Sequence, residues 1–467
     1  MPHVRSSPGP PAEWKYFTTT FSYIPCIWVS ETFEFGMFRS FSLLCIIAIS
    51  SFTCAEPVAL PTELSAYQLD PAPQVTSLQL RKGDRLAICG DSITEQKMYS
   101  VIIETYLTAC TPELEITSRQ YGWSGEQASG FLSRMKSDVL RFKPTIATTC
   151  YGMNDFRYVP FDEAFAAEYR KNLIEIYKQF RDAECRVIIG SSGIIDSVPH
   201  WVKSARGSQQ DLNLSLSKFR NIALDVATTE KAGFADIYQP MLLADFHAKK
   251  DIGPEFKIAG KDGVHPGWAG QVLMARAFLK AMGLDGNLGE ISWDAASDKS
   301  SASGGHEIIS CAGGKLKIRS SKLPFSVDEG DAKNDNSIRA GLALVPFDQE
   351  LNRFTLRVTS PKAKAYKVSW GTESKQYTAE QLVAGVSLAT DFIKHPLLPA
   401  FQNVWQAVLE KQSYETKQIK SIVHGKQGKD NPDAAFAETE LIRAPLAEKV
   451  KNSLQPVEHE IVITPVE

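Results

Sequence analysis

Three residues of this chain stand in contexts that suit nucleophilic catalysis. Ser92 follows a short apolar run, residues 86–89, and precedes a helix-like segment. A serine at such a strand-to-helix turn exposes its hydroxyl and holds its backbone N–H near a helix N-terminus, where an oxyanion is stabilised. Far downstream, Asp262 stands three residues before His265. At that spacing the carboxylate can orient the imidazole as a base for the serine.

A fourth residue could stabilise the negative charge that such an attack creates. Asn154 lies in the sequence Gly-Met-Asn-Asp, which follows a further apolar run over residues 145–150. Its side-chain amide is a candidate donor to an oxyanion, although an asparagine at this place can also cap a turn. The pattern therefore favours acyl transfer with Ser92, His265, Asp262 and Asn154 as the reacting set.

Four blocks of this sequence resemble the SGNH (GDSL-type) hydrolases in order and spacing. They are Gly-Asp-Ser at 90–92, Gly125 in Trp-Ser-Gly-Glu, Asn154, and the pair Asp262 and His265. The likeness covers roughly residues 84–283. One departure is Ile93, which stands where the family's motif has leucine.

The resemblance implies a role for each of these residues. Ser92 would be the nucleophile, His265 its base, and Asp262 the group that fixes the imidazole. The oxyanion hole would consist of the N–H groups of Ser92 and Gly125 and the amide of Asn154. Glycine suits this place because it has no Cβ and lets its backbone approach a ligand; Gly122 is the alternative to Gly125.

A metal-dependent phosphoesterase is a weaker interpretation of the same region. Asp91, Asp155, Asp262 and His265 offer the ligand types that hard cations prefer. That interpretation gives no role to Ser92 or Asn154, so we predict no metal and no organic cofactor. For Asp91 and Asp155 we expect caps or loop hydrogen bonds instead.

Several aromatic and basic residues stand close to the oxyanion candidates. We predict that Trp123, Phe156, Arg157 and Tyr158 bind the substrate, because aromatic faces suit sugar rings or acyl chains and Arg157 can hold a carboxylate or sulfate. Two further tryptophans are expected to pack locally, and six histidines receive no catalytic role. These are Trp201 and Trp268, and His200, His247, His306, His395, His424 and His459.

Composition limits the class of protein. The chain has 467 residues, of which 43% are hydrophobic and 22% charged, which is ordinary for a globular protein of about two domains. The net charge of −3 favours neither nucleic acid nor an anionic membrane surface as a partner. We therefore expect no nucleic acid as a partner. The resemblance implies a small-molecule or polysaccharide ester as the substrate, and the oligomeric state stays open.

An apolar run near the N-terminus resembles a secretory signal. Residues 41–52 follow Met37 and Arg39, and small residues at 53–55 precede Glu56. We predict a signal peptide over 37–55, cleaved after Ala55, which leaves no transmembrane span and exports the protein to the periplasm or the extracellular space. Residues 1–36 would then be a spurious or disordered lead; a genuine extension with an uncleaved anchor is the alternative.

Eight cysteines show no metal-binding spacing. Three of them, Cys26, Cys45 and Cys54, would leave with the signal. Cys89, Cys150 and Cys185 lie in or beside predicted strands, where a free cysteine behaves as a small hydrophobic residue. We expect buried thiols there, and the sequence does not decide whether the remaining cysteines form any disulfide.

Alternating periodicities predict an α/β domain over residues 85–285, after an extended lead over 56–84, and the resemblance identifies it as an SGNH hydrolase domain. Predicted strands alternate with helices that are amphipathic at helical spacing, which favours a parallel sheet covered on both sides. Ligands bind beyond the carboxyl ends of such strands, where Ser92, Gly125 and Asn154 are placed. The fold we predict is a flavodoxin-like three-layer α/β/α domain. The expected strands are 85–89, 114–119, 145–150, 186–190 and 233–237, and the expected helices 95–110, 127–142, 161–182, 208–231 and 266–282.

The pattern changes after residue 285. A Ser-rich stretch at 294–305 reads as a linker or an exposed loop, and a small antiparallel β-rich region is predicted within 286–370. A helical extension with a terminal strand follows over 371–467. The expected strands are 315–319, 340–345, 353–358, 366–370 and 460–465; the expected helices are 379–392, 399–412, 414–424 and 435–454, with a flexible stretch at 425–434 and an interruption near Pro445.

These observations together predict an exported serine esterase that hydrolyses carboxylic esters through an acyl-enzyme. Within the SGNH class, deacetylation of extracellular carbohydrate is the leading expectation. A lysophospholipase- or thioesterase-like acyl hydrolase is the alternative within the class. A non-catalytic carbohydrate-binding protein, with the β-rich region as a binding or docking module, is the alternative outside it.

Overall fold

Five short runs of buried residues form a central parallel sheet. β1 (Arg85–Gly90), β3 (Ile146–Cys150) and β4 (Arg186–Gly190) are buried at almost every position. β2 (Thr117–Gly122) and β5 (Gly233–Ala235) complete the sheet in the order β2-β1-β3-β4-β5. Strands covered on both faces have such continuous apolar runs. The order and direction confirm the predicted flavodoxin-like topology.

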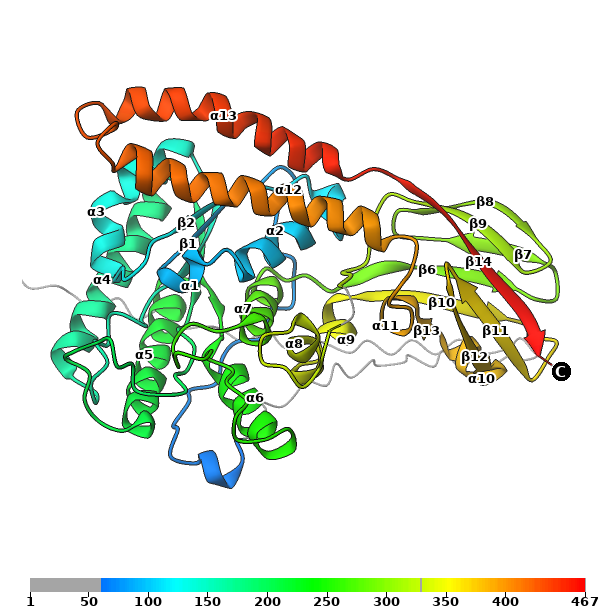
Figure 1. Cartoon of the computed structure of the whole chain (residues 1–467), viewed down its shortest axis with the longest axis horizontal. Coiled ribbons are helices and arrows are strands. Elements are labelled where there is room, and N and C mark those ends of the chain that lie inside the picture. The colour runs from blue at the N-terminus through cyan, green and yellow to red at the C-terminus, as the bar shows by residue number, and fades with distance from the viewer. Residues whose placement is uncertain (1–59, 328–329, 467) are drawn as a thin grey trace, which may run out of the picture. The chain divides into compact units, whose positions relative to one another are not determined.

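Helices cover both faces of this sheet (Figure 1). α4 (Glu163–Asp182) packs between α3 (Ala128–Asp138) and α5 (Gln209–Glu230), whereas α2 (Tyr99–Ala109) packs against α7 (Trp268–Ala281). Local sequence signals place their starts. The Asp162 side chain caps α4, and Ser208 forms a capping box with Asp211 at the start of α5.

The hydrolase part departs from the predicted elements in three places. The expected helix 95–110 is two helices, α1 (Ser92–Glu95) and α2, because Lys97 between them adopts a left-handed conformation. β2 lies three residues later than the run we expected at 114–119. An additional helix, α6 (Tyr238–Asp251), follows β5. Its apolar and charged residues are not segregated into a clear stripe, which explains why periodicity missed it.

This computed structural model describes residues 60–327 and 330–466, and every statement on structure refers to them. The predicted lead at 1–36, the signal peptide at 37–55 and Cys26, Cys45 and Cys54 lie outside the described residues. Within them, no helix combines the length and the apolar character that crossing a bilayer requires. The described cysteines, Cys89, Cys110, Cys150, Cys185 and Cys311, are free thiols, and all except Cys311 are buried.

Two further sheets follow the hydrolase part. One has the order β13-β10-β6-β7 and the other β12-β11-β14-β9-β8. They pack against each other through aromatic rings, Phe354 on Trp370 and Trp293 on Tyr366. Their strands are β6 (Asn287–Asp294), β7 (Lys299–Ala302), β8 (His306–Ala312), β9 (Lys315–Ser320), β10 (Arg353–Thr359), β11 (Ala365–Trp370), β12 (Glu373–Thr378), β13 (Val386–Ser387) and β14 (Val457–Val466).

Three predictions for this β-rich region were wrong. The stretch 294–305 is not a linker, because β6 and β7 form a hairpin there. The sheets are not purely antiparallel, since β6 and β10 pair in parallel. The expected strand 340–345 is helix α8 (Ile338–Leu344). Gly341 explains the last difference: a Cβ on it would lie 2.6 Å from Val272, so the glycine permits close packing of α8 on α7.

The C-terminal region is a helical hairpin that returns to the β-rich part (Figure 1). α12 (Leu398–Thr416) continues into a π-helix, η4 (Lys417–Val423), and α13 (Pro432–Ser453) leads back to β14. β14 pairs with β11 and β9, which confirms the predicted return of the terminal strand. Two details differ from expectation: α13 runs through Pro445 without interruption, and α10 (Ala379–Ala384), β13 and α11 (Leu388–Asp391) replace one helix at 379–392.

The helical hairpin packs directly on the hydrolase part. α12 contacts α2 and β2, and a buried ion cluster crosses this contact. Lys411 Nζ donates to Ser118 O at 2.8 Å and pairs with Glu415 at 2.8 Å and Glu104 at 3.1 Å. The described residues, 60–327 and 330–466, accordingly belong to one compact unit. The proposed domain boundary near 285 therefore marks a change of architecture within that unit.

A chain of buried histidines connects the two β-rich sheets. The Trp370 indole donates to His459 Nδ1 at 3.0 Å, so His459 must donate through Nε2 to Ser320 Oγ at 2.8 Å. Ser320 is then the donor to His306 Nδ1 at 2.7 Å, and His306 Nε2 donates to Leu288 O at 2.9 Å. A third ring, His395, stacks on Trp370 with centroids 4.6 Å apart. This arrangement requires neutral imidazoles.

Acid should therefore destabilise this core through its histidines. Burial, with nearby Lys322, lowers the pKa of His306 to about 4; burial, with His459 and Arg339, lowers the pKa of His395 to about 3. Because the unfolded chain binds these protons below about pH 6.5 and the folded chain does not, each histidine removes roughly 1.4 kcal/mol of stability per pH unit between 6.5 and its folded pKa.

The His395→Phe variant isolates the contribution of one histidine to the pH dependence of stability. Buried carboxyl groups with raised pKa values have the opposite effect, but they are present in both proteins and cancel in the comparison. We expect wild type to lose about 2 kcal/mol more than the variant between pH 7 and pH 5, by urea unfolding. Parallel stability curves for the two proteins would show that His395 does not stay neutral in the fold.

Candidate active site

Ser92 lies at the turn from β1 into α1, at the carboxyl end of the central sheet. Asp91 caps the helix, because its Oδ1 accepts the Ile93 N–H at 3.0 Å, and α1 begins at Ser92 itself. Burial raises the pKa of Asp91 to about 7. Its side chain therefore acts in the turn as expected for a cap, while the half-buried Ser92 hydroxyl faces the loop that carries His265.

Ser92, His265 and Asp262 form a continuous chain of hydrogen bonds. Ser92 Oγ lies 2.8 Å from His265 Nε2, and His265 Nδ1 lies 2.7 Å from Asp262 Oδ2. The second carboxylate oxygen, Oδ1, accepts the backbone N–H groups of Val264 and His265, both at 2.9 Å. One tight turn thus supplies both the base and the group that orients it.

A glycine and a carboxylate fix this turn. Gly260 has φ +84°, and a Cβ there would lie 1.8 Å from the His265 carbonyl oxygen, so only glycine allows the loop to close. Burial raises the pKa of Asp262, but the N–H groups of His265 and Val264 and the imidazole outweigh burial and lower it overall. Asp262 is therefore ionised at neutral pH and holds the proton of the imidazole on Nδ1.

Gly125 and Asn154 follow β2 and β3, the two neighbours of β1 in the parallel sheet, and so lie at the same edge of the sheet as Ser92. Asn154 Nδ2 donates to Glu126 O at 3.1 Å and makes a long contact of 3.4 Å with Asp91 Oδ2. Tyr158 donates its hydroxyl to Asn154 Oδ1 at 3.4 Å, which fixes which end of the amide carries the N–H groups. Gly125 has φ +73° and open space where a Cβ would stand.

The four predicted substrate residues have different surroundings. Phe156 is 1% exposed and packs on Tyr158 and Phe219, so its ring belongs to the core. Tyr158 is also buried and contacts Asn154. Arg157 pairs with Glu168 at 2.6 Å on the surface. Only Trp123 of the four lines the cavity described below.

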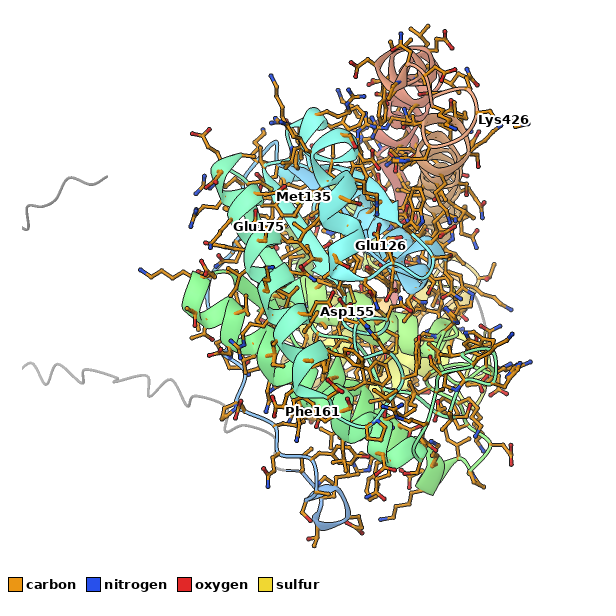
Figure 2. All side chains as sticks on the ribbon, turned by 90° about the vertical axis from the view of Figure 1, so that its left-hand side faces the viewer. Glu126, Met135, Asp155, Phe161, Glu175 and Lys426 are labelled. Carbon is orange, nitrogen blue, oxygen red and sulfur yellow. The ribbon has the colours of Figure 1, made fainter. Side chains whose placement is uncertain are left out.

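A polar cavity of about 420 Å³ opens beside Gly125. Nine of its ten lining residues come from positions 123–134, and the tenth is His424, which follows η4. Figure 2 looks onto the side of the molecule that carries Glu126 and Asp155. Lys426, which lies in the turn between η4 and α13, is seen on the same side. The C-terminal extension therefore contributes to the surroundings of the candidate oxyanion hole.

Two residues near the site escaped the sequence analysis. Trp201 was expected to pack locally, but it is 42% exposed and stacks on His265 with ring centroids 6.0 Å apart. His424 received no role, yet it lines the cavity and contacts Trp123. Neither lies in a motif, so no local signal identified them. Trp268, by contrast, packs on Trp405 as expected.

The carboxylates considered as metal ligands serve the loops instead. Asp155 accepts the N–H groups of Ala128 and Gly152, both at 2.9 Å, and burial raises its pKa to about 6. Among residues 60–327 and 330–466, no three His, Cys, Asp or Glu side chains converge as a metal-binding group. The described residues do form the Ser92–His265–Asp262 chain of hydrogen bonds, a geometry in which a serine can act as a nucleophile.

Comparisons with known proteins agree with this arrangement. Residues 88–273 match the GDSL-like lipase/acylhydrolase family. An acetylxylan esterase of Geobacillus stearothermophilus is 25% identical over 224 residues, which is 44% of this chain and 98% of the relative. Its crystal structure has a TM-score of 0.37 at 23% identity, covering 44% of this chain and 97% of that chain.

A second solved structure matches more of the chain. A gut microbial diltiazem-metabolizing enzyme has a TM-score of 0.67 at 21% identity, and the match covers 84% of this chain and 100% of that chain. This likeness shows that the fold, including much of the region after residue 285, is shared. Residues 88–273 therefore match a GDSL-like lipase/acylhydrolase domain, and this match supports a carboxylic ester hydrolase.

Proposed function

We propose that this hydrolase acts through Ser92, His265 and Asp262 and removes acetyl groups from carbohydrate outside the cell. The observation that carries the mechanism is the unbroken chain of hydrogen bonds from Ser92 Oγ to Asp262, 2.8 Å and 2.7 Å long. A serine hydroxyl is protonated at neutral pH and needs such an adjacent base to attack an ester.

The reaction follows from these contacts. His265 Nε2 takes the Ser92 proton while Oγ attacks the ester carbonyl, and Asp262 stabilises the imidazolium that forms. The tetrahedral intermediate collapses, the C–O bond to the alcohol breaks, and His265 returns the proton to the departing alcohol. Water then attacks the acyl-enzyme with His265 as its base, which releases the acid and restores Ser92.

Three donors would stabilise the oxyanion of each intermediate. They are the N–H groups of Ser92 and Gly125 and the amide of Asn154. The amide N–H that lies 3.4 Å from Asp91 makes a weak contact, so a substrate oxyanion can replace it at little cost. The Tyr158 hydroxyl and the Glu126 carbonyl hold the amide in place meanwhile.

Loss of the Asn154 amide should slow catalysis without unfolding the protein. We expect Asn154→Ala to lower kcat on p-nitrophenyl acetate by ~10²–10³ fold, because one preorganised oxyanion donor is removed. The surface variant Asn452→Ala, far along α13, is the matched control and should retain full activity. A normal kcat for Asn154→Ala would remove this residue from the oxyanion hole.

Two observations support a small acyl group on a carbohydrate. The related acetylxylan esterase acts, by its name, on such an ester. The cavity beside Gly125 is lined mainly by polar side chains, which suit an alcohol rich in hydroxyl groups. We expect kcat/KM to fall from p-nitrophenyl acetate through butyrate to octanoate, with acetate released from acetylated xylo-oligosaccharides. A profile that rises with chain length would favour a lysophospholipase- or thioesterase-like acyl hydrolase instead.

Export rests on the sequence of residues 37–55 alone. Expression of the chain from Met37 in a bacterial host, followed by N-terminal sequencing of the secreted or periplasmic protein, should give Glu56 as the first residue. Recovery of only the unprocessed chain in the cytoplasm would contradict export by this segment.

A further inference from the structure

The cavity beside Gly125 is built from two distant parts of the chain. Ser124 and Gly125 form its edge next to the proposed oxyanion hole, and His424 closes it from the C-terminal extension. His424 contacts the Trp123 ring edge to face, with centroids 5.1 Å apart. A ligand in this cavity would therefore touch the extension and the reaction centre at the same time.

An ion pair and a hydrogen bond attach the extension to the cavity walls. Lys420, in the π-helix η4, pairs with Glu95 at 2.6 Å, and Glu95 accepts both the N–H and the hydroxyl of Ser124, at 2.5 and 2.6 Å. His424 Nε2 lies 2.8 Å from Asp138, whose side chain is fully buried. π-Helices are rare and often occur at functional sites. Here η4 holds the loop that carries Gly125.

The chemistry of the lining suits a hydroxyl-rich ring. Trp123 offers an aromatic face, while Ser129, Ser133 and Gln127 offer hydroxyl and amide groups. Among the described residues, His424 makes its hydrogen bonds through Nε2, which leaves Nδ1 to accept from a ligand hydroxyl. Arg134, also in the wall, is neutralised by Glu126 at 2.6 Å, so the cavity does not select for an anion.

We propose that this cavity binds the alcohol part of the ester, a pyranose unit, and that His424 determines specificity for it. The inference rests on the proposed function, because the sugar that it places in the cavity is the alcohol part of the acetyl ester proposed above. Its consequence is that the C-terminal extension selects the substrate of the hydrolase domain.

The test compares two acetyl esters that differ only in their alcohol. We expect His424→Ala to lower kcat/KM on an acetylated methyl xyloside at least ~10-fold, mainly through KM, and on p-nitrophenyl acetate less than about threefold. His247→Ala, an exposed histidine on α6, is the matched control and should change neither value. Equal losses on both esters, or no loss on either, would overturn the proposal.

A binding measurement separates specificity from folding and from turnover. In a Ser92→Ala background, the acetylated methyl xyloside should bind measurably by calorimetry, and adding His424→Ala should weaken that binding about 10-fold. Both proteins are measured well below their melting temperatures, because the variant leaves the buried Asp138 with one partner fewer. Binding that is unchanged by His424→Ala would overturn the assignment. If wild type does not hydrolyse p-nitrophenyl acetate, the proposed function fails, and this binding arm still decides the subsite.

Discussion

The Ser92→Ala variant should lose at least ~10⁴-fold in kcat on p-nitrophenyl acetate while it folds normally. Removal of the nucleophile ends the acyl-enzyme route, and what is left is the contribution of the oxyanion hole and binding. The hydroxyl is half-buried and hydrogen-bonded to His265 at 2.8 Å, so its loss leaves no large cavity. Initial rates with purified protein, normalised to folded fraction by circular dichroism, measure the effect.

The control for this substitution is a serine that no proposed step uses. Ser204 is exposed in the loop after β4, and Ser204→Ala should keep the wild-type kcat. Asp262→Asn should lower kcat by ~10⁴-fold, because the asparagine amide leaves the imidazole in the wrong tautomer. Substantial residual turnover in Ser92→Ala, above that of a preparation from cells lacking the gene, would mean that another group is the nucleophile.

The second large effect is on stability and falls far from the catalytic chain. Lys411→Met should reduce the free energy of unfolding by about 3–5 kcal/mol. The Lys411 ammonium is 2% exposed and lies between Glu104 and Glu415, so its removal leaves two buried carboxylates facing each other with one cation fewer. The neighbouring Arg443 still pairs with Glu415 at 2.9 Å and limits the damage. Urea unfolding at pH 7 measures the change.

An exposed lysine on the same helical hairpin provides the comparison. Lys449 pairs with Glu410 at 2.5 Å, but both side chains are more than half exposed. Lys449→Met should therefore change stability by less than about 1 kcal/mol. Similar effects for the two lysines would show that the contact between α12 and the hydrolase part is loose, and that the extension behaves as a separate body.

Local sequence predicted the elements whose own residues determine their structure. β4 has the bounds expected at 186–190 because it is a continuous apolar run between polar turns. α8 was mistaken for a strand because its short apolar run fits either element, and only the close approach of Gly341 to Val272 on α7 decides for a helix. β7 was missed because it is a short, polar edge strand that depends on β6.

The residues of the candidate site were predicted or missed for the same reason. Ser92, Asp262 and His265 could be identified because each lies in a compact motif, and the sheet topology then explains their meeting. Trp201 and His424 reach the site from a long loop and from the far end of the chain. Only the tertiary fold shows these contacts, because neither Trp201 nor His424 lies in a sequence motif that indicates a function.

The most direct test of the account is covalent labelling of the nucleophile. A fluorophosphonate should add one adduct to the wild-type protein, and peptide mass spectrometry should place it on Ser92. Labelling should be absent in Ser92→Ala and suppressed by prior incubation with a slowly hydrolysed ester. An adduct on another residue, or none on a folded and active wild-type protein, would contradict the proposed serine mechanism.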